Sequence, residues 1–86
     1  MISNTEWHLI CNKLKDILSD KAYNISYTDT VFSYDIITNK FGEHVNLLQK
    51  NNVESIFVSD DNFKIFCKNN IMFTINNTIT KEFYIN

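Results

Sequence analysis

The chain has 86 residues, of which 44% are hydrophobic and 21% charged. This is enough for one domain with a packed core and too few for two, so we expect a single domain over residues 1–86. The charged residues are eight lysines, no arginine and ten carboxylates, with a net charge of −2, and the lack of an arginine-rich basic stripe argues against a nucleic-acid partner.

The first predicted element is an amphipathic helix at about residues 4–20. Apolar residues recur there every three or four positions, which places them on one helical face. Ser3 and Glu6 have the spacing of a capping box, and Ile2 and Trp7 occupy the two positions of a hydrophobic staple. The apolar face consists of Trp7, Ile10, Cys11, Leu14, Ile17 and Leu18.

Two strands are predicted next, at residues 23–27 and 31–37, because apolar and polar residues alternate there. The polar residues 28–30 between them suit a hairpin connection.

Residues 40–52 fit two structures. The spacing of Phe41, Val45 and Leu48 is helical, whereas Gly42 and the pair Asn51 and Asn52 equally suit a strand between two turns. We favour a short helix, because asparagine is a good left-handed helix terminator.

The remainder predicts four strands at residues 53–59, 63–68, 71–75 and 79–85, separated by turns rich in aspartate and asparagine. The fold class is therefore α+β, with the N-terminal helix packed on a mainly antiparallel sheet. The order is α-ββ-α-ββββ, or one helix followed by strands alone if residues 40–52 are not helical.

Two strand-forming segments, residues 56–58 and 71–75, are apolar, and the chain has no proline to protect a sheet edge. If such an edge is exposed, we expect a partner or a second copy of the chain to cover it.

Candidates for chemistry are few. His8, Cys11, His44 and Cys67 are zinc-ligand types without the paired spacing of a zinc site, and Cys67 with His44 is a weak nucleophile pair. Adjacent carboxylates in a turn point apart, as Asp60 and Asp61 would, and a single glycine leaves no phosphate-binding loop. We therefore expect no cofactor, no metal and no enzymatic activity.

The sequence contains no signal peptide and no apolar stretch of the ~20 residues needed to cross a bilayer, which predicts a cytoplasmic protein without membrane contact. Cys11 and Cys67 are then expected to be reduced and buried, although one disulfide is an alternative. Thirteen asparagines, twelve isoleucines and no arginine or proline indicate a gene from an AT-rich genome.

Size and charge favour a small protein-binding module whose partner has a basic surface. The module would be an inhibitor, antitoxin or immunity protein. It could be encoded by a phage or mobile element and block a nucleic-acid enzyme. Apolar residues on both faces of segments 31–37 and 63–68 suggest an interface on the uncovered face. The alternative is a nucleic-acid-associated regulator that uses strand aromatics and lysines. The candidate partner-binding residues are Asp35, Glu43, Glu54, Asp60, Asp61, Tyr34 and Phe66.

Overall fold

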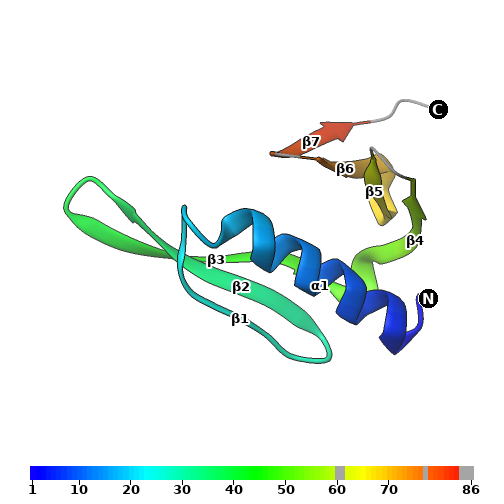
Figure 1. The fold of residues 1–86 in the computed structure, drawn as a ribbon, viewed down its shortest axis with the longest axis horizontal. Helices are drawn as coiled ribbons and strands as arrows, with labels where there is room; N and C mark the ends of the chain where they lie inside the picture. Colours follow the sequence, from blue (N-terminus) through cyan, green and yellow to red (C-terminus); the bar gives the residue numbers. More distant parts are fainter. Residues whose placement is uncertain (60–61, 77, 84–86) are drawn as a thin grey trace.

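The computed structural model describes residues 1–59, 62–76 and 78–83 and shows an α+β fold with one helix and two antiparallel sheets (Figure 1). The three-stranded sheet has the order β1-β2-β3, and the four-stranded sheet has the order β4-β5-β6-β7. Within each sheet, every strand pairs with the strand that precedes or follows it in the chain. The elements are α1 (Asn4–Leu18), β1 (Tyr23–Tyr27), β2 (Val31–Thr38), β3 (Phe41–Gln49), β4 (Val53–Val58), β5 (Phe63–Cys67), β6 (Ile71–Ile75) and β7 (Ile79–Phe83), with short 3-10 turns at Lys50–Asn52 and Lys68–Asn70.

Helix α1 begins where the capping signal predicts. The Ser3 hydroxyl accepts the Glu6 backbone N–H, and the Glu6 carboxylate accepts the Ser3 backbone N–H. Ile2 and Trp7 are both buried, as expected for a hydrophobic staple. The helix ends at Leu18, two residues before the predicted end, where the Leu18 carbonyl accepts two backbone N–H groups in a turn.

The strands β1 and β2 are joined by the predicted turn. Its geometry is set by Thr28, whose hydroxyl accepts the backbone N–H groups of Thr30 and Val31 at 3.2 Å each. Near the other end of β1 the register shifts by one residue, and Asn24 there has a φ of 50°. Such a bulge twists the strand and redirects the side chains around it.

The helix favoured for residues 40–52 is wrong, because residues 41–49 form strand β3. β2 turns directly into β3 at Asn39, which has a φ of 56° and supplies the left-handed conformation of a two-residue hairpin turn. A bulge in β3 leaves Leu47 as an extra residue, because Phe32 pairs with Leu48 and Ser33 pairs with Asn46. The extra residue interrupts the alternation of apolar and polar residues along β3, so their spacing in the sequence resembles that of a helix.

The strands also form two sheets, not the one sheet expected. After β3 the chain makes a 3-10 turn and starts β4, which pairs with β5 and not with β3. The segment 71–75 lies inside the second sheet as β6, so it has no free edge, whereas β4 is an edge strand with Phe57 and Val58 exposed. Of the two apolar segments, only residues 56–58 in β4 therefore lie at a sheet edge that could pair with another chain.

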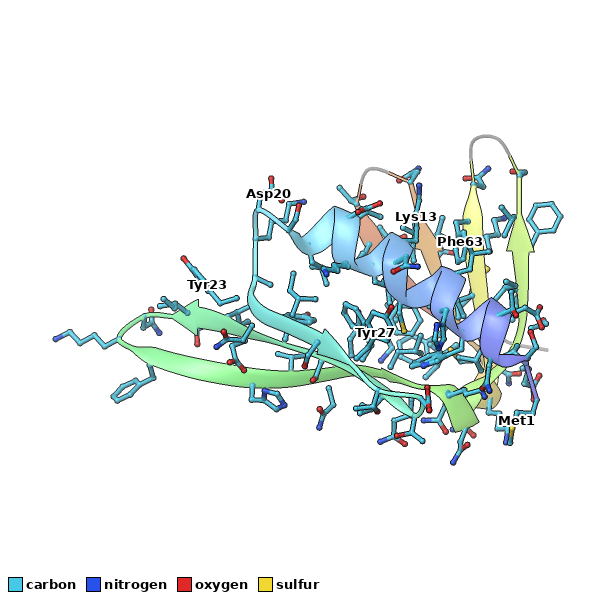
Figure 2. The ribbon with its side chains drawn as sticks, turned by 60° about the horizontal axis from the view of Figure 1, so that its bottom comes forward. Met1, Lys13, Asp20, Tyr23, Tyr27 and Phe63 are labelled. Atoms are coloured by element: carbon cyan, nitrogen blue, oxygen red, sulfur yellow. The ribbon has the colours of Figure 1, made fainter. Side chains whose placement is uncertain are left out.

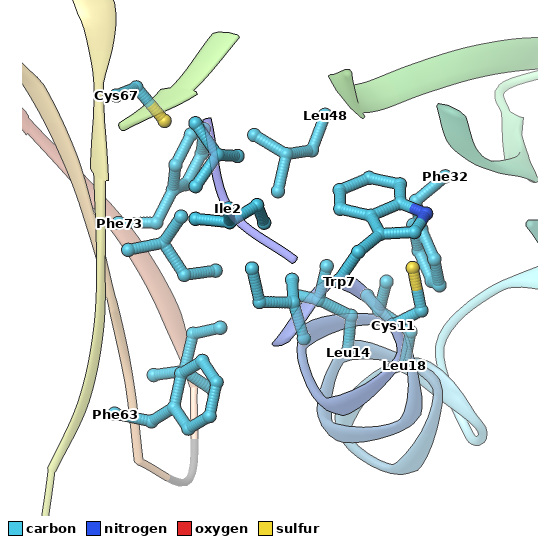
Figure 3. Close-up of a cluster of buried hydrophobic side chains, with 14 residues drawn as sticks. Ile2, Trp7, Cys11, Leu14, Leu18, Phe32, Leu48, Phe63, Cys67 and Phe73 are labelled. Atoms are coloured by element: carbon cyan, nitrogen blue, oxygen red, sulfur yellow. The ribbon is translucent and has the colours of Figure 1, made fainter. Parts of the chain in front are cut away.

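The core lies between α1 and the two sheets (Figure 3). Trp7 and Leu14 from the helix, Phe32 from β2 and Phe73 from β6 belong to one cluster of buried side chains, so the helix and both sheets share a single core. Among the described residues, no helix is both long enough and apolar enough to cross a bilayer.

The two cysteines are free and buried. Burial raises the pKa of the Cys11 thiol to about 12, and it also raises the pKa of the Cys67 thiol. Both residues therefore act as small apolar core residues, and the alternative of a disulfide is wrong.

Candidate functional site

The structure does not bring the candidate partner-binding residues to one place. Asp35, Glu43 and Tyr34 lie on the β2–β3 hairpin, whereas Glu54 and Phe66 lie in the second sheet. Asp60 and Asp61 lie outside the described residues.

The two aromatic candidates differ in their surroundings. Tyr34 packs against the core, with its ring centroid 6.4 Å from that of Phe32. Phe66 alternates with two core-facing residues of β5 and therefore lies on the opposite face of the second sheet, where it pairs with Met72 and is partly buried. Of these two aromatic residues, Phe66 is therefore the one on a sheet face away from the core, where the sequence suggested an interface.

Asp35 is the centre of a small polar cluster. Because it follows core-facing Tyr34, alternation places its side chain on the face of β2 away from α1. Asn24 Nδ2 donates to Asp35 Oδ2 at 3.0 Å, and His44 Nδ1 lies 2.6 Å from Asp35 Oδ1. The cluster joins all three strands of the first sheet, because Asn24 lies on β1, Asp35 on β2 and His44 on β3. His44 is the register partner of Asp35, and Asn24 directly follows Tyr23, the register partner of Asp35 on β1.

Hydrogen bonds from Asn24, and then from His44, hold the pKa of Asp35 below its ordinary value. The folded state therefore binds the proton less readily than the unfolded state does. The ionised carboxylate stabilises the fold fully above the unfolded pKa of about 3.9, and this contribution is lost as the pH falls through the lowered pKa of the folded state.

We expect Asp35→Asn to lower the urea midpoint at pH 7, with a difference from the wild type that shrinks as the pH falls from 5 to 2. The matched control is Glu43→Gln, which removes an equal charge from the same hairpin and leaves the three-residue cluster intact. Urea unfolding followed by circular dichroism across this pH range measures both. A difference for Asp35→Asn that does not depend on pH contradicts the linkage.

The β2–β3 hairpin extends past the C-terminal end of α1 as an arm, defined as residues 35–44 (Figure 1). Near its tip, Phe41 is 76% exposed and Ile37 is 66% exposed, and Ile37 pairs with Gly42, which has open space around it. Tyr23 stands free near the base of the arm, whereas Tyr27 lies beneath the helix (Figure 2). The sequence did not single out the arm, because its second strand was expected to be a helix.

A groove lies where the helix and the two sheets meet. It has a larger cavity of about 410 Å³ and a smaller one of about 200 Å³, and the two share Leu47, Phe73 and Lys81. Lys21 and Tyr34 also line the larger cavity, and Lys68 lines the smaller one. These lysines are far apart in the sequence, and no local pattern could have indicated that they share a groove.

The residue sets weighed for metal or nucleophile chemistry do not form a site. Cys11 and Cys67 face the core, and His44 lies on the outer face of the first sheet. Within residues 1–59, 62–76 and 78–83, no three His, Cys, Asp or Glu side chains are placed to hold one metal ion.

Comparisons of this chain with protein-family models, with curated proteins and with solved structures found no match. The arm and the groove are two surfaces of this protein that are suited to binding.

Proposed function

We propose that this protein is a small protein-binding module that contacts its partner through the arm. The observation that supports this best is the exposure of Ile37 and Phe41 on a hairpin that extends beyond the body of the fold. The strand register places Phe41 on the face of Thr38 and Ile37 on the opposite face with Gly42, so each face of the arm exposes one large apolar side chain. Exposed apolar surface of this kind marks sites where proteins bind each other. Aromatic residues in particular contribute much of the energy at protein interfaces.

Charge at the base of the arm supports a basic partner. Asp35 and Glu43 both lie on the arm, and Lys40 is the only lysine there. The Asp35 carboxylate is already oriented by Asn24 and His44, so it loses little conformational freedom when a lysine or arginine of a partner approaches. Such a contact adds specificity and speeds association at low salt.

A module of this kind acts by occupying a surface of its partner. The small size and the acidic balance support an inhibitor, antitoxin or immunity protein, without enzymatic activity of its own, and the basic surface of a nucleic-acid enzyme is a suitable target. A phage or mobile element is a fitting origin for an inhibitor of this type.

The test is affinity capture with a matched control. The wild type, an arm variant (Ile37→Ser with Phe41→Ser) and a control variant (Phe57→Ser with Val58→Ser) are used to capture proteins from a nuclease-treated lysate of a host with an AT-rich genome. The control removes a comparable apolar pair, since Phe57 is 53% and Val58 54% exposed on β4. Quantitative mass spectrometry compares the three captures.

We expect one protein to be retained stoichiometrically by the wild type and the control and lost at least tenfold by the arm variant, because two interface anchors cost on the order of 1–2 kcal/mol each. Retention should fall between 50 and 300 mM salt if Asp35 and Glu43 contribute. Equal captures by all three proteins, or no retained protein, argue against the arm as a binding surface.

The alternative, a nucleic-acid-associated regulator, remains a prediction from the lysines and the strand aromatics. A gel shift at low salt distinguishes the two functions. The regulator should retard single- or double-stranded nucleic acid, whereas a protein-binding module should retard neither.

A further inference from the structure

The larger cavity of the groove combines an apolar floor with a polar rim. Its floor consists of Ile17 and Leu18 of α1, Leu47 of β3, Phe73 of β6 and Ile79 of β7. These side chains belong to the core or pack against it, so the cavity opens directly onto the core. A volume of about 410 Å³ lies within the range of small-molecule sites, roughly 300–1,000 Å³.

The rim is positively charged. Lys21 and Lys81 line the larger cavity, and Lys68 and Lys81 line the smaller one. Among the residues that the structure describes, neither lining includes an aspartate or glutamate. Glu82 follows Lys81 directly, but alternation along β7 places it on the other face of the sheet, opposite Met72. Three of the eight lysines therefore gather around this groove in a chain whose net charge is negative.

From this arrangement we infer that the groove binds an amphiphilic carboxylate, namely a fatty acid, with its alkyl chain in the larger cavity and its carboxylate beside Lys81 and Lys21. The apolar floor suits an alkyl chain, since a chain of methylene groups needs no hydrogen-bonding partner there. The ammonium groups of Lys21 and Lys81, which line this cavity, suit the negatively charged end.

The lining favours this ligand over two others. An extended acidic peptide would bring backbone N–H and C=O groups into a cavity whose floor offers five apolar side chains. A single-stranded nucleic acid needs exposed rings on which to stack, whereas Phe73 is buried and Tyr34 is partly buried in the groove.

The inference is tested by calorimetric titration of the whole chain with decanoate, below the concentration at which it forms micelles. Decanol tests the need for the charge, and decyltrimethylammonium tests its sign. Acetate tests the need for the alkyl chain. We expect saturable binding of one decanoate per chain, at least tenfold weaker binding of decanol, and none of the cation or of acetate.

Two variants separate the contributions of charge and cavity. Lys81→Gln should weaken decanoate binding by about tenfold and leave decanol binding unchanged, because only the carboxylate forms a charge-assisted hydrogen bond with the ammonium group. Lys13→Gln on the outer surface of α1 is the matched control and should bind as the wild type does. Ile79→Trp fills the cavity and should weaken decanoate and decanol alike; its thermal unfolding and circular dichroism show whether the fold is kept.

Decanoate and decanol that bind equally, or Lys81→Gln and Lys13→Gln that behave alike, would overturn the inference. The same holds if no decanoate binds and either an acidic peptide or oligothymidylate binds in its place in a manner that depends on Lys81. None of these results depends on the arm, so the ligand of the groove and the proposed function are tested independently.

Discussion

Replacing Trp7 with alanine should remove a large part of the free energy of unfolding of this protein. Trp7 is fully buried at the start of α1, and its indole Nε1 donates to the carbonyl of Thr28 at 2.8 Å, which ties the helix to the first sheet. Loss of a buried tryptophan costs about 3–5 kcal/mol, and the total stability of a chain of this size is roughly 4–13 kcal/mol. We therefore expect Trp7→Ala to unfold at a much lower urea concentration than the wild type, and to be unfolded at 25 °C if the wild type lies at the low end of this range.

Urea unfolding followed by far-ultraviolet circular dichroism measures this effect. Trp7→Phe keeps most of the ring volume but leaves the Thr28 carbonyl without its donor, so it should cost a smaller amount, about 1–3 kcal/mol. Leu9→Ala on the exposed side of the same helix should cost less than about 1 kcal/mol. If Trp7→Ala unfolds within about 1 kcal/mol of the wild type, then the described packing around the indole is wrong.

Ile65→Ala should destabilise the whole chain although it lies in the second sheet. Ile65 is fully buried on β5, between β4 and β6, and it belongs to the same core cluster as Trp7. The expected cost is about 2–5 kcal/mol. Because the helix and both sheets share this core, the chain should unfold as one unit, which is what a single domain over residues 1–86 predicts.

Trp7 fluorescence and circular dichroism, measured in the same urea titration, test this. In the wild type and in Ile65→Ala the two signals should have one common midpoint, lowered in the variant. Phe57→Ala removes a large but exposed side chain from neighbouring β4 and should have little effect. A variant in which the fluorescence midpoint stays at its wild-type value would show that the second sheet unfolds independently.

The start of the helix and most of the strands could be predicted because their signals are local. Ser3 and Glu6 are three residues apart, and the alternation in β1, β2, β5 and β6 lies within each strand. A helix was favoured over the strand alternative at β3 because the bulge at Leu47 breaks the alternation, and because Asn39 was not identified as the hairpin turn. The division into two sheets depends on which strands pair, and alternation within a strand does not determine this.

The candidate site was predictable only in part for the same reason. Asp35 was named for its charge, but its partners Asn24 and His44 are 11 and 9 residues away, and only the strand register brings them together. The groove was even less predictable from the sequence, because Lys21 follows α1 whereas Lys81 lies in the last strand, β7. Contacts of this kind depend on the packing of the two sheets, which the sequence pattern does not specify.

The neighbour-to-neighbour pairing of both sheets also affects how fast the chain folds. Every strand pairs with the strand before or after it, so the hairpins need only short loops to close, and such local contacts form quickly. The chain has no proline, and the slow phase of tens of seconds that prolyl isomerisation imposes on many proteins is therefore absent. A newly made chain can thus pair its own strands before the apolar segment at residues 56–58 meets that of another copy.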